Sequence, residues 1–118
     1  MAIQPPHPPE SRDGTPGAFL SLISLSLLEL RQDVARLFDR GWAEPVRRRA
    51  HVLAVALSDA CGREGLEELA TLIRSLANLT RLPKEEAGSL GPALREKLEE
   101  LLDRAQRLTA TYSKRRIG

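Results

Sequence analysis

The stretch RRRAHVLAVALSDACG, residues 47–62, decides how the chain folds. Its apolar residues recur every three or four positions, which places them on one face of an α-helix. Pro45 suits the first turn of a helix, and Gly62 suits the position just after its last turn. We therefore expect a helix between these two residues, with an inward face that comprises Val46, Ala50, Leu53, Leu57 and the pair Ala60/Cys61.

Amphipathic segments of the same kind lie before and after this helix. The first runs from Thr15 to Gly41, where a glycine is expected to end a helix and Trp42 can fold back on Leu37 or Phe38. Two more segments span residues 63–82 and 92–113. The three expected inward faces comprise Phe19, Ile23, Leu27, Leu30, Val34 and Leu37; Leu66, Leu69, Leu72, Ile73, Leu76 and Leu79; and Leu94, Leu98, Leu101, Ala105, Leu108 and Tyr112.

The connections between these four segments are short, and no segment shows the alternating pattern of a strand. Residues 84–91, which include Gly88 and Gly91, are expected to form a linker with one short turn. Four amphipathic helices joined in this way predict an all-α fold. We expect an antiparallel four-helix up-and-down bundle over residues 15–113.

The two ends of the chain have a different composition. Residues 1–14 contain four prolines and few apolar side chains, which predicts a disordered tail. His7 lies in this tail, without the further ligands that a metal site needs. Residues 114–118 form a short basic tail.

The first helical segment carries more apolar side chains than one inward face requires. Leu20, Leu25 and Leu28 lie off its main stripe. Two interpretations are open, because such a helix is either clamped between two neighbours or presents a surface to a partner. A homodimer is one form of the second interpretation.

The composition excludes several classes of function. Lys and Arg number 18 and Asp and Glu number 16, so no strong overall field attracts nucleic acid or an anionic membrane. Aromatic residues make up 3%, which argues against a base-stacking surface and against an aromatic-rich ligand pocket. A single cysteine forms no intrachain disulfide, and no signal peptide or bilayer-spanning run is recognisable. We expect a cytoplasmic protein without a metal or cofactor.

Basic residues cluster at two places. Arg47, Arg48 and Arg49 open the helix of residues 45–62, and residues 114–116 are Lys-Arg-Arg. Three consecutive arginines spread around a helix and do not form a stripe. Together with the balanced charge and the few aromatic residues, this makes nucleic acid an unfavoured partner.

His51 is the one reactive side chain in the predicted bundle. It points roughly 120° away from the centre of the inward face, on a flank shared with Arg47, Ala54, Val55 and Ser58. A neutral imidazole nitrogen is a good nucleophile near pH 7, and small neighbours would let another protein bring a carboxylate close. His51 is therefore a candidate phosphoryl carrier, and the alternative is an ordinary surface histidine.

These residues resemble the histidine phosphotransfer domains, including those of chemotaxis histidine kinases. In that family an Arg/Ala stretch precedes the phospho-accepting histidine, an aliphatic residue follows two positions later, and a glycine lies about ten positions later. Arg49-Ala50-His51, Leu53 and Gly62 are similar to this pattern, with Gly62 one position late. The likeness in architecture covers residues 18–112. Two family positions differ, because Ala54 stands at a usual lysine and Val55 at a usual glycine.

The resemblance implies a protein of bacterial two-component signalling. It would dock a response-regulator receiver or a histidine kinase domain. His51 would accept the phosphoryl group, and the protein would be a phosphotransfer intermediate and not a turnover enzyme. The expected contact surface comprises Arg47, Arg48, Ala54, Val55, Ser58, Leu20 and Leu28. In the alternative, a non-catalytic helical adaptor, the same bundle binds a protein partner through an apolar helix face.

Overall fold

The computed structural model describes residues 17–117, with side chains as far as residue 115. The predicted tail of residues 1–14 lies outside the described part. Within residues 17–117 the chain forms helices and no strand, so the all-α prediction is confirmed. The helices are α2 (Gly17–Asp39), α3 (Glu44–Arg63), α4 (Glu67–Thr80), α5 (Lys84–Leu90) and α6 (Pro92–Ile117).

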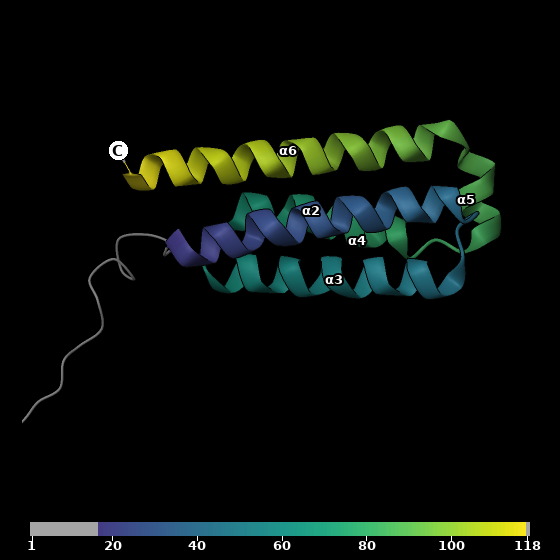
Figure 1. Cartoon of the computed structure of the whole chain (residues 1–118), viewed down its shortest axis with the longest axis horizontal. Helices are drawn as coiled ribbons and strands as arrows, with labels where there is room; N and C mark the ends of the chain where they lie inside the picture. The colour runs from purple at the N-terminus through teal and green to yellow at the C-terminus, as the bar shows by residue number, and fades with distance from the viewer. Residues whose placement is uncertain (1–16, 118) are drawn as a thin grey trace, which may run out of the picture.

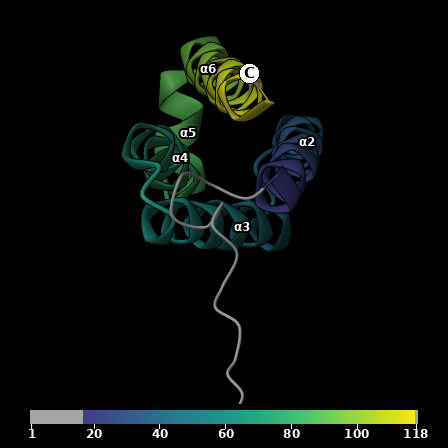
Figure 2. The same cartoon turned by 90° about the vertical axis from the view of Figure 1, so that its left-hand side faces the viewer.

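Four of these helices are long and lie side by side, running in alternating directions along the molecule (Figure 1). Seen end-on, they surround a common centre in which α2 contacts α3 and α6, and α4 contacts the same two helices (Figure 2). The count of four helices is wrong, since the expected linker forms the additional helix α5 at one end of the molecule. The last helix also continues beyond residue 113 through Ile117.

The core contains the inward faces of α2, α4 and α6 much as their spacing predicts. A single cluster of buried apolar side chains joins the long helices. Burying leucine and isoleucine side chains in this way supplies most of the favourable free energy of folding. The largest fully buried members are Ile23, Leu27, Leu30, Leu37, Leu69, Ile73, Leu76, Leu98 and Leu102.

The inward face of α3 is rotated from the prediction. Ala54 and Ser58 are buried, whereas Val46 and Leu53 are only partly buried. Small side chains at Ala50, Ala54 and Ser58 follow one another at four-residue spacing. They allow close approach of a neighbouring helix, and Ser58 Oγ donates a hydrogen bond to the carbonyl of Ala70 in α4 at 3.0 Å. The core face of α3 therefore turns toward α4.

The predicted end of α2 is confirmed. Gly41 has a φ of 66°, and the backbone N–H of Trp42 donates to the carbonyl of Leu37 at 2.6 Å. The Trp42 ring lies 5.6 Å from the Phe38 ring in an edge-to-face arrangement, and its Nε1 donates to the carbonyl of Leu82 at 2.8 Å. This is a Schellman-type helix end with its hydrophobic contact, and it ties the α2–α3 turn to the end of α4.

The predicted end of α3 is wrong by three residues. Gly62 lies within the last turn of the helix, and Gly65, with a φ of 80°, is the residue that ends it. The N–H of Gly65 donates to the carbonyl of Gly62 at 3.0 Å, and that of Leu66 donates to the carbonyl of Cys61 at 2.9 Å. These hydrogen bonds satisfy the last carbonyls of α3. Helix α4 therefore begins at Glu67 and not at residue 63 as predicted.

These two glycines provide a paired test of the turn. Gly65→Ala should lower the free energy of unfolding by about 1–2 kcal/mol, because alanine disfavours a left-handed backbone. Gly62→Ala should raise it by about 0.5 kcal/mol, because alanine favours the helix and nothing lies within 4 Å of the added Cβ. Urea denaturation of both variants measures the two changes. Equal effects of the two substitutions would contradict this assignment of the helix end.

None of the helices among residues 17–117 has the length and apolar character needed to cross a bilayer.

Candidate functional site

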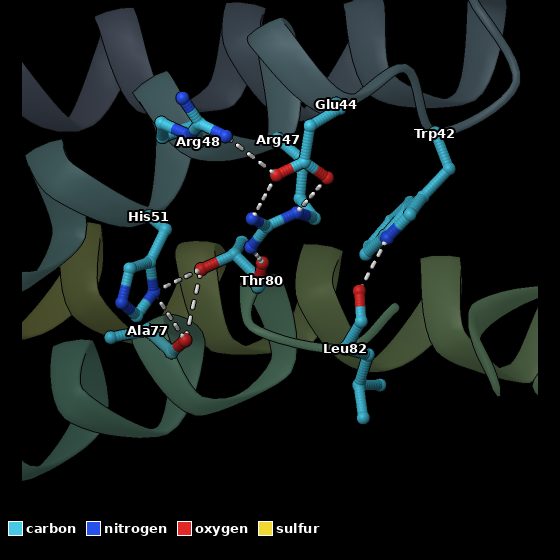
Figure 3. Close-up of polar contacts among 8 residues, drawn as sticks. All are labelled: Trp42, Glu44, Arg47, Arg48, His51, Ala77, Thr80 and Leu82. Atoms are coloured by element: carbon cyan, nitrogen blue, oxygen red, sulfur yellow. Dashed lines mark hydrogen bonds and ion pairs between the residues drawn. The ribbon is translucent and has the colours of Figure 1, made fainter. Parts of the chain in front are cut away.

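His51 is half-buried on α3 and faces α4 (Figure 3). Its Nδ1 lies 2.9 Å from the carbonyl oxygen of Ala77 and 3.3 Å from Oγ1 of Thr80. The expected open flank is therefore partly covered by α4. The rotation of the α3 core face explains this difference, because it brings the His51 side of the helix toward α4.

The contact with Ala77 fixes the proton of the imidazole ring. A carbonyl oxygen only accepts hydrogen bonds, so Nδ1 must carry a proton and donate it to Ala77. The Thr80 hydroxyl donates to the same carbonyl at 2.9 Å. In the neutral ring Nε2 then holds the lone pair, and this nitrogen points away from Ala77 (Figure 3).

A pocket of about 200 Å³ lies beside His51 between α3 and α4. Two guanidinium groups, Arg74 and Arg81, line it together with one carboxylate, Asp59. Both arginines are exposed, and neither forms an ion pair with another residue of the described range. The remaining lining residues are Val55, Ser58, Ala77 and Asn78. The His51 imidazole therefore lines one pocket with two guanidinium groups, which bind phosphoryl oxygens well.

Arg47 is engaged elsewhere. Its Nε and Nη2 donate to the Glu44 carboxylate at 3.0 and 2.6 Å, and its Nη1 donates to the carbonyl of Thr80 at 2.8 Å (Figure 3). The hydrogen bonds from Arg47 lower the pKa of Glu44 to about 2, and Glu44 raises the pKa of Arg47 in return. Arg47 thus links the start of α3 to the end of α4, and its guanidinium is held by these contacts within the protein.

The other predicted contact residues of α3 lie in three different places. Val55 and Ser58 line the His51 pocket, although Ser58 is buried. Arg48 is exposed, lies 3.3 Å from Glu44, and lines a separate groove between α2 and α3. Ala54 is completely buried, so it offers no surface to a partner.

The extra leucines of α2 differ in burial. One is buried in the core and the others form an exposed surface. Leu20 is buried, so the expectation that it belongs to a contact surface is wrong. Leu25 and Leu28 are exposed, and Leu22 joins them. The face of α2 turned away from the core therefore remains apolar.

Sequence reasoning missed the two arginines of the pocket. Arginines toward the C-terminal end of a helix interact favourably with the helix dipole, so the sequence offers an ordinary structural explanation for Arg74 and Arg81. Together with Asn78 they follow a spacing of four and three, which marks one polar face of α4. That spacing was the available signal, but only the packing of α3 on α4 turns the face toward His51.

Cys61 is fully buried, as expected for a small apolar side chain. Burial raises the pKa of its thiol to about 11, and the nearby Glu64 carboxylate adds to this shift. Since the thiolate is the reactive form, Cys61 is protected from acting as a nucleophile.

The thiol should make stability fall at alkaline pH. The unfolded thiol, with an ordinary pKa of 9.0, loses its proton first, so the folded state binds more protons between pH 9 and pH 11. The stability contribution is therefore complete below pH 9 and is lost as the pH rises toward 11. We expect wild type to lose about 2 kcal/mol more than Cys61→Ala across this range in urea denaturation. Equal losses of stability in wild type and Cys61→Ala would show that the Cys61 thiol does not cause the alkaline destabilisation.

No group of three or more His, Cys, Asp and Glu side chains suited to a metal ion occurs in the part of the chain that the structure describes. Comparison of the chain with protein-family models, curated proteins and solved structures finds no match.

Proposed function

We propose that the protein is a phosphoryl carrier resembling the histidine phosphotransfer domains, with Nε2 of His51 as the phospho-acceptor. The observation that carries the proposal is the hydrogen bond from Nδ1 to Ala77, which leaves the lone pair on Nε2 of a side chain that lines the same pocket as Arg74 and Arg81. The two arginines provide the positive charge that Ala54 lacks at the usual lysine position.

The chemistry follows from this arrangement. Nε2 attacks the phosphorus of an aspartyl phosphate on a receiver domain, the new N–P bond forms, and the P–O bond to the aspartate breaks. The carboxylate leaves with the bonding electrons. The imidazole ring gains positive charge, which strengthens the hydrogen bond that Nδ1 donates to the Ala77 carbonyl. Arg74 and Arg81 neutralise charge on the phosphoryl oxygens.

A receiver or kinase domain is the expected partner because its acidic site complements the pocket. Arg74 and Arg81 outnumber Asp59 among the charged lining residues, and Val55 offers a partly exposed apolar contact. The Asp59 carboxylate repels a small free anion that enters the pocket. We therefore expect phosphate transfer within a docked complex to be faster than transfer from a small donor.

The direct test is the incorporation of acid-labile phosphate from a phosphorylated receiver or from phosphoramidate. His51→Gln should reduce incorporation by at least about 100-fold, because glutamine lacks a nucleophilic nitrogen. His7→Gln is the matched control, since His7 is the other histidine of the chain, and it should leave incorporation unchanged. Equal labelling of wild type and His51→Gln would exclude the carrier role.

A second candidate function is a helical adaptor without chemistry, and the exposed leucines of α2 favour it. Leu22, Leu25 and Leu28 are all at least half exposed. Sedimentation should show self-association of wild type that is lost in Leu25→Glu/Leu28→Glu and retained in the control Ser21→Glu/Ser24→Glu. A wild-type protein that is monomeric at every concentration would rule out the homodimer form of this alternative.

A further inference from the structure

A larger pocket is lined by residues from the end of α2, the α2–α3 turn, α5 and the start of α6. These segments lie at the end of the molecule away from the α3–α4 turn (Figure 1). The volume of the pocket is about 480 Å³. Pockets that bind small molecules commonly have volumes of roughly 300–1,000 Å³. This pocket does not include His51 or the arginines beside it.

The walls of this pocket are mainly apolar. Phe38 and Trp42 line it, which brings together two of the four aromatic residues of the chain. The scarcity of aromatic residues argued against such a pocket, but folding concentrates them at one place. The indole Nε1 of Trp42 already donates to the carbonyl of Leu82, so the indole offers a ligand apolar contact and no free donor.

Gly88 lines the pocket from α5 without a side chain. It lies within α5, where glycine costs about 1 kcal/mol of helix stability relative to alanine. Its φ is not positive, in contrast to those of Gly41 and Gly91, which also line the pocket, and nothing lies within 4 Å of a Cβ added to it. Neither backbone conformation nor close packing therefore requires glycine here. Since Gly88 lines the pocket and its added Cβ meets open space, a larger side chain at this position has room to extend into the pocket.

The charged lining residues are both basic. Lys84 forms no ion pair with any residue in the described range. Arg95 lies with its guanidinium 5.3 Å from the centre of the Phe38 ring and donates from Nε to Glu99 at 3.1 Å. The apolar wall and the two cations together suit a ligand with an apolar body and one negative charge.

We propose that this pocket binds a small amphipathic carboxylate, with an alkyl or aryl body against Phe38 and Trp42 in the space beside Gly88. Lys84 and Arg95 hold the carboxylate at the rim. This site is independent of His51, so its success or failure leaves the proposed phosphoryl transfer unaffected.

Trp42 is the only tryptophan of the chain, so its fluorescence reports on this pocket. The full chain is titrated with octanoate, octanol and octylammonium below their micelle concentrations. Octanoate should produce a saturable change and bind at least about tenfold more tightly than octylammonium, with octanol between them. Absence of a saturable change with octanoate would overturn the proposal. Equal binding of all three probes would also overturn it, because the pocket would then be a non-selective apolar site.

Two kinds of variant locate the bound probe. Gly88→Leu fills the space on a helical backbone and should weaken octanoate binding by at least about tenfold, whereas the adjacent, exposed Ser89→Leu should not. Lys84→Gln/Arg95→Gln should weaken octanoate by about fivefold and leave octanol unchanged. Circular dichroism checks that each variant is folded. Octanoate binding that is unchanged in Gly88→Leu or in the Lys84→Gln/Arg95→Gln variant would place the ligand elsewhere and refute the assignment.

Discussion

The double variant Arg74→Gln/Arg81→Gln should accept phosphate on His51 about 100-fold more slowly than wild type. Charged donors that meet developing charge in a transition state contribute strongly to rate, and each exposed arginine is expected to contribute about tenfold. The variant should remain folded, because both side chains are exposed and form no ion pair within residues 17–117. Rates of labelling from a phosphorylated receiver measure the effect.

A charge-matched variant separates a local effect from an overall one. Arg104→Gln/Arg107→Gln removes the same charge from an exposed face of α6 that lies outside the His51 pocket. It should transfer phosphate within about twofold of the wild-type rate. If the two double variants slow transfer equally, Arg74 and Arg81 act only through the net charge and the pocket has no specific role.

Ile73→Ala should produce the largest loss of stability. Ile73 is fully buried in α4, and its replacement removes apolar contacts and leaves a cavity in the core. The expected cost is about 3 kcal/mol, which lowers Tm by at least about 10 °C. Thermal denaturation measured with Thr71→Ala, an exposed position of the same helix, provides the control and should differ from wild type by less than about 0.5 kcal/mol. A comparable loss in both variants would show that α4 is not packed as described.

The ends of the helices show what a sequence can predict. Pro92 begins α6 because the proline ring fixes φ at a helical value and the first turn needs no backbone N–H. Gly41 ends α2 because glycine adopts a positive φ without steric cost. Gly62 misled the prediction because Gly65, three residues later, adopts the left-handed conformation in its place. Helix α5 was missed because seven residues that include a glycine give a weak helical pattern.

The sequence predicted His51 as the candidate residue, but it did not predict the residues that surround it. His51 stands out by its residue type and by its place on α3. Its partner, the carbonyl of Ala77, is 26 residues away and carries no side-chain signal, since any residue has a carbonyl. The burial of Ala54 depends on how closely α4 approaches, and hydrophobic spacing gives small side chains little weight. Packing therefore decides which nitrogen of His51 carries the proton, and sequence alone does not.

The central claim is that Nε2 of His51 accepts the phosphoryl group while Nδ1 remains bonded to Ala77. Nuclear magnetic resonance of the ¹⁵N-labelled, phosphorylated protein identifies the nitrogen that carries phosphorus. We predict phosphate on Nε2 and a proton on Nδ1, with no such signal in His51→Gln. Phosphate on Nδ1, or a phosphorylated protein in which His51 is unmodified, would contradict the account.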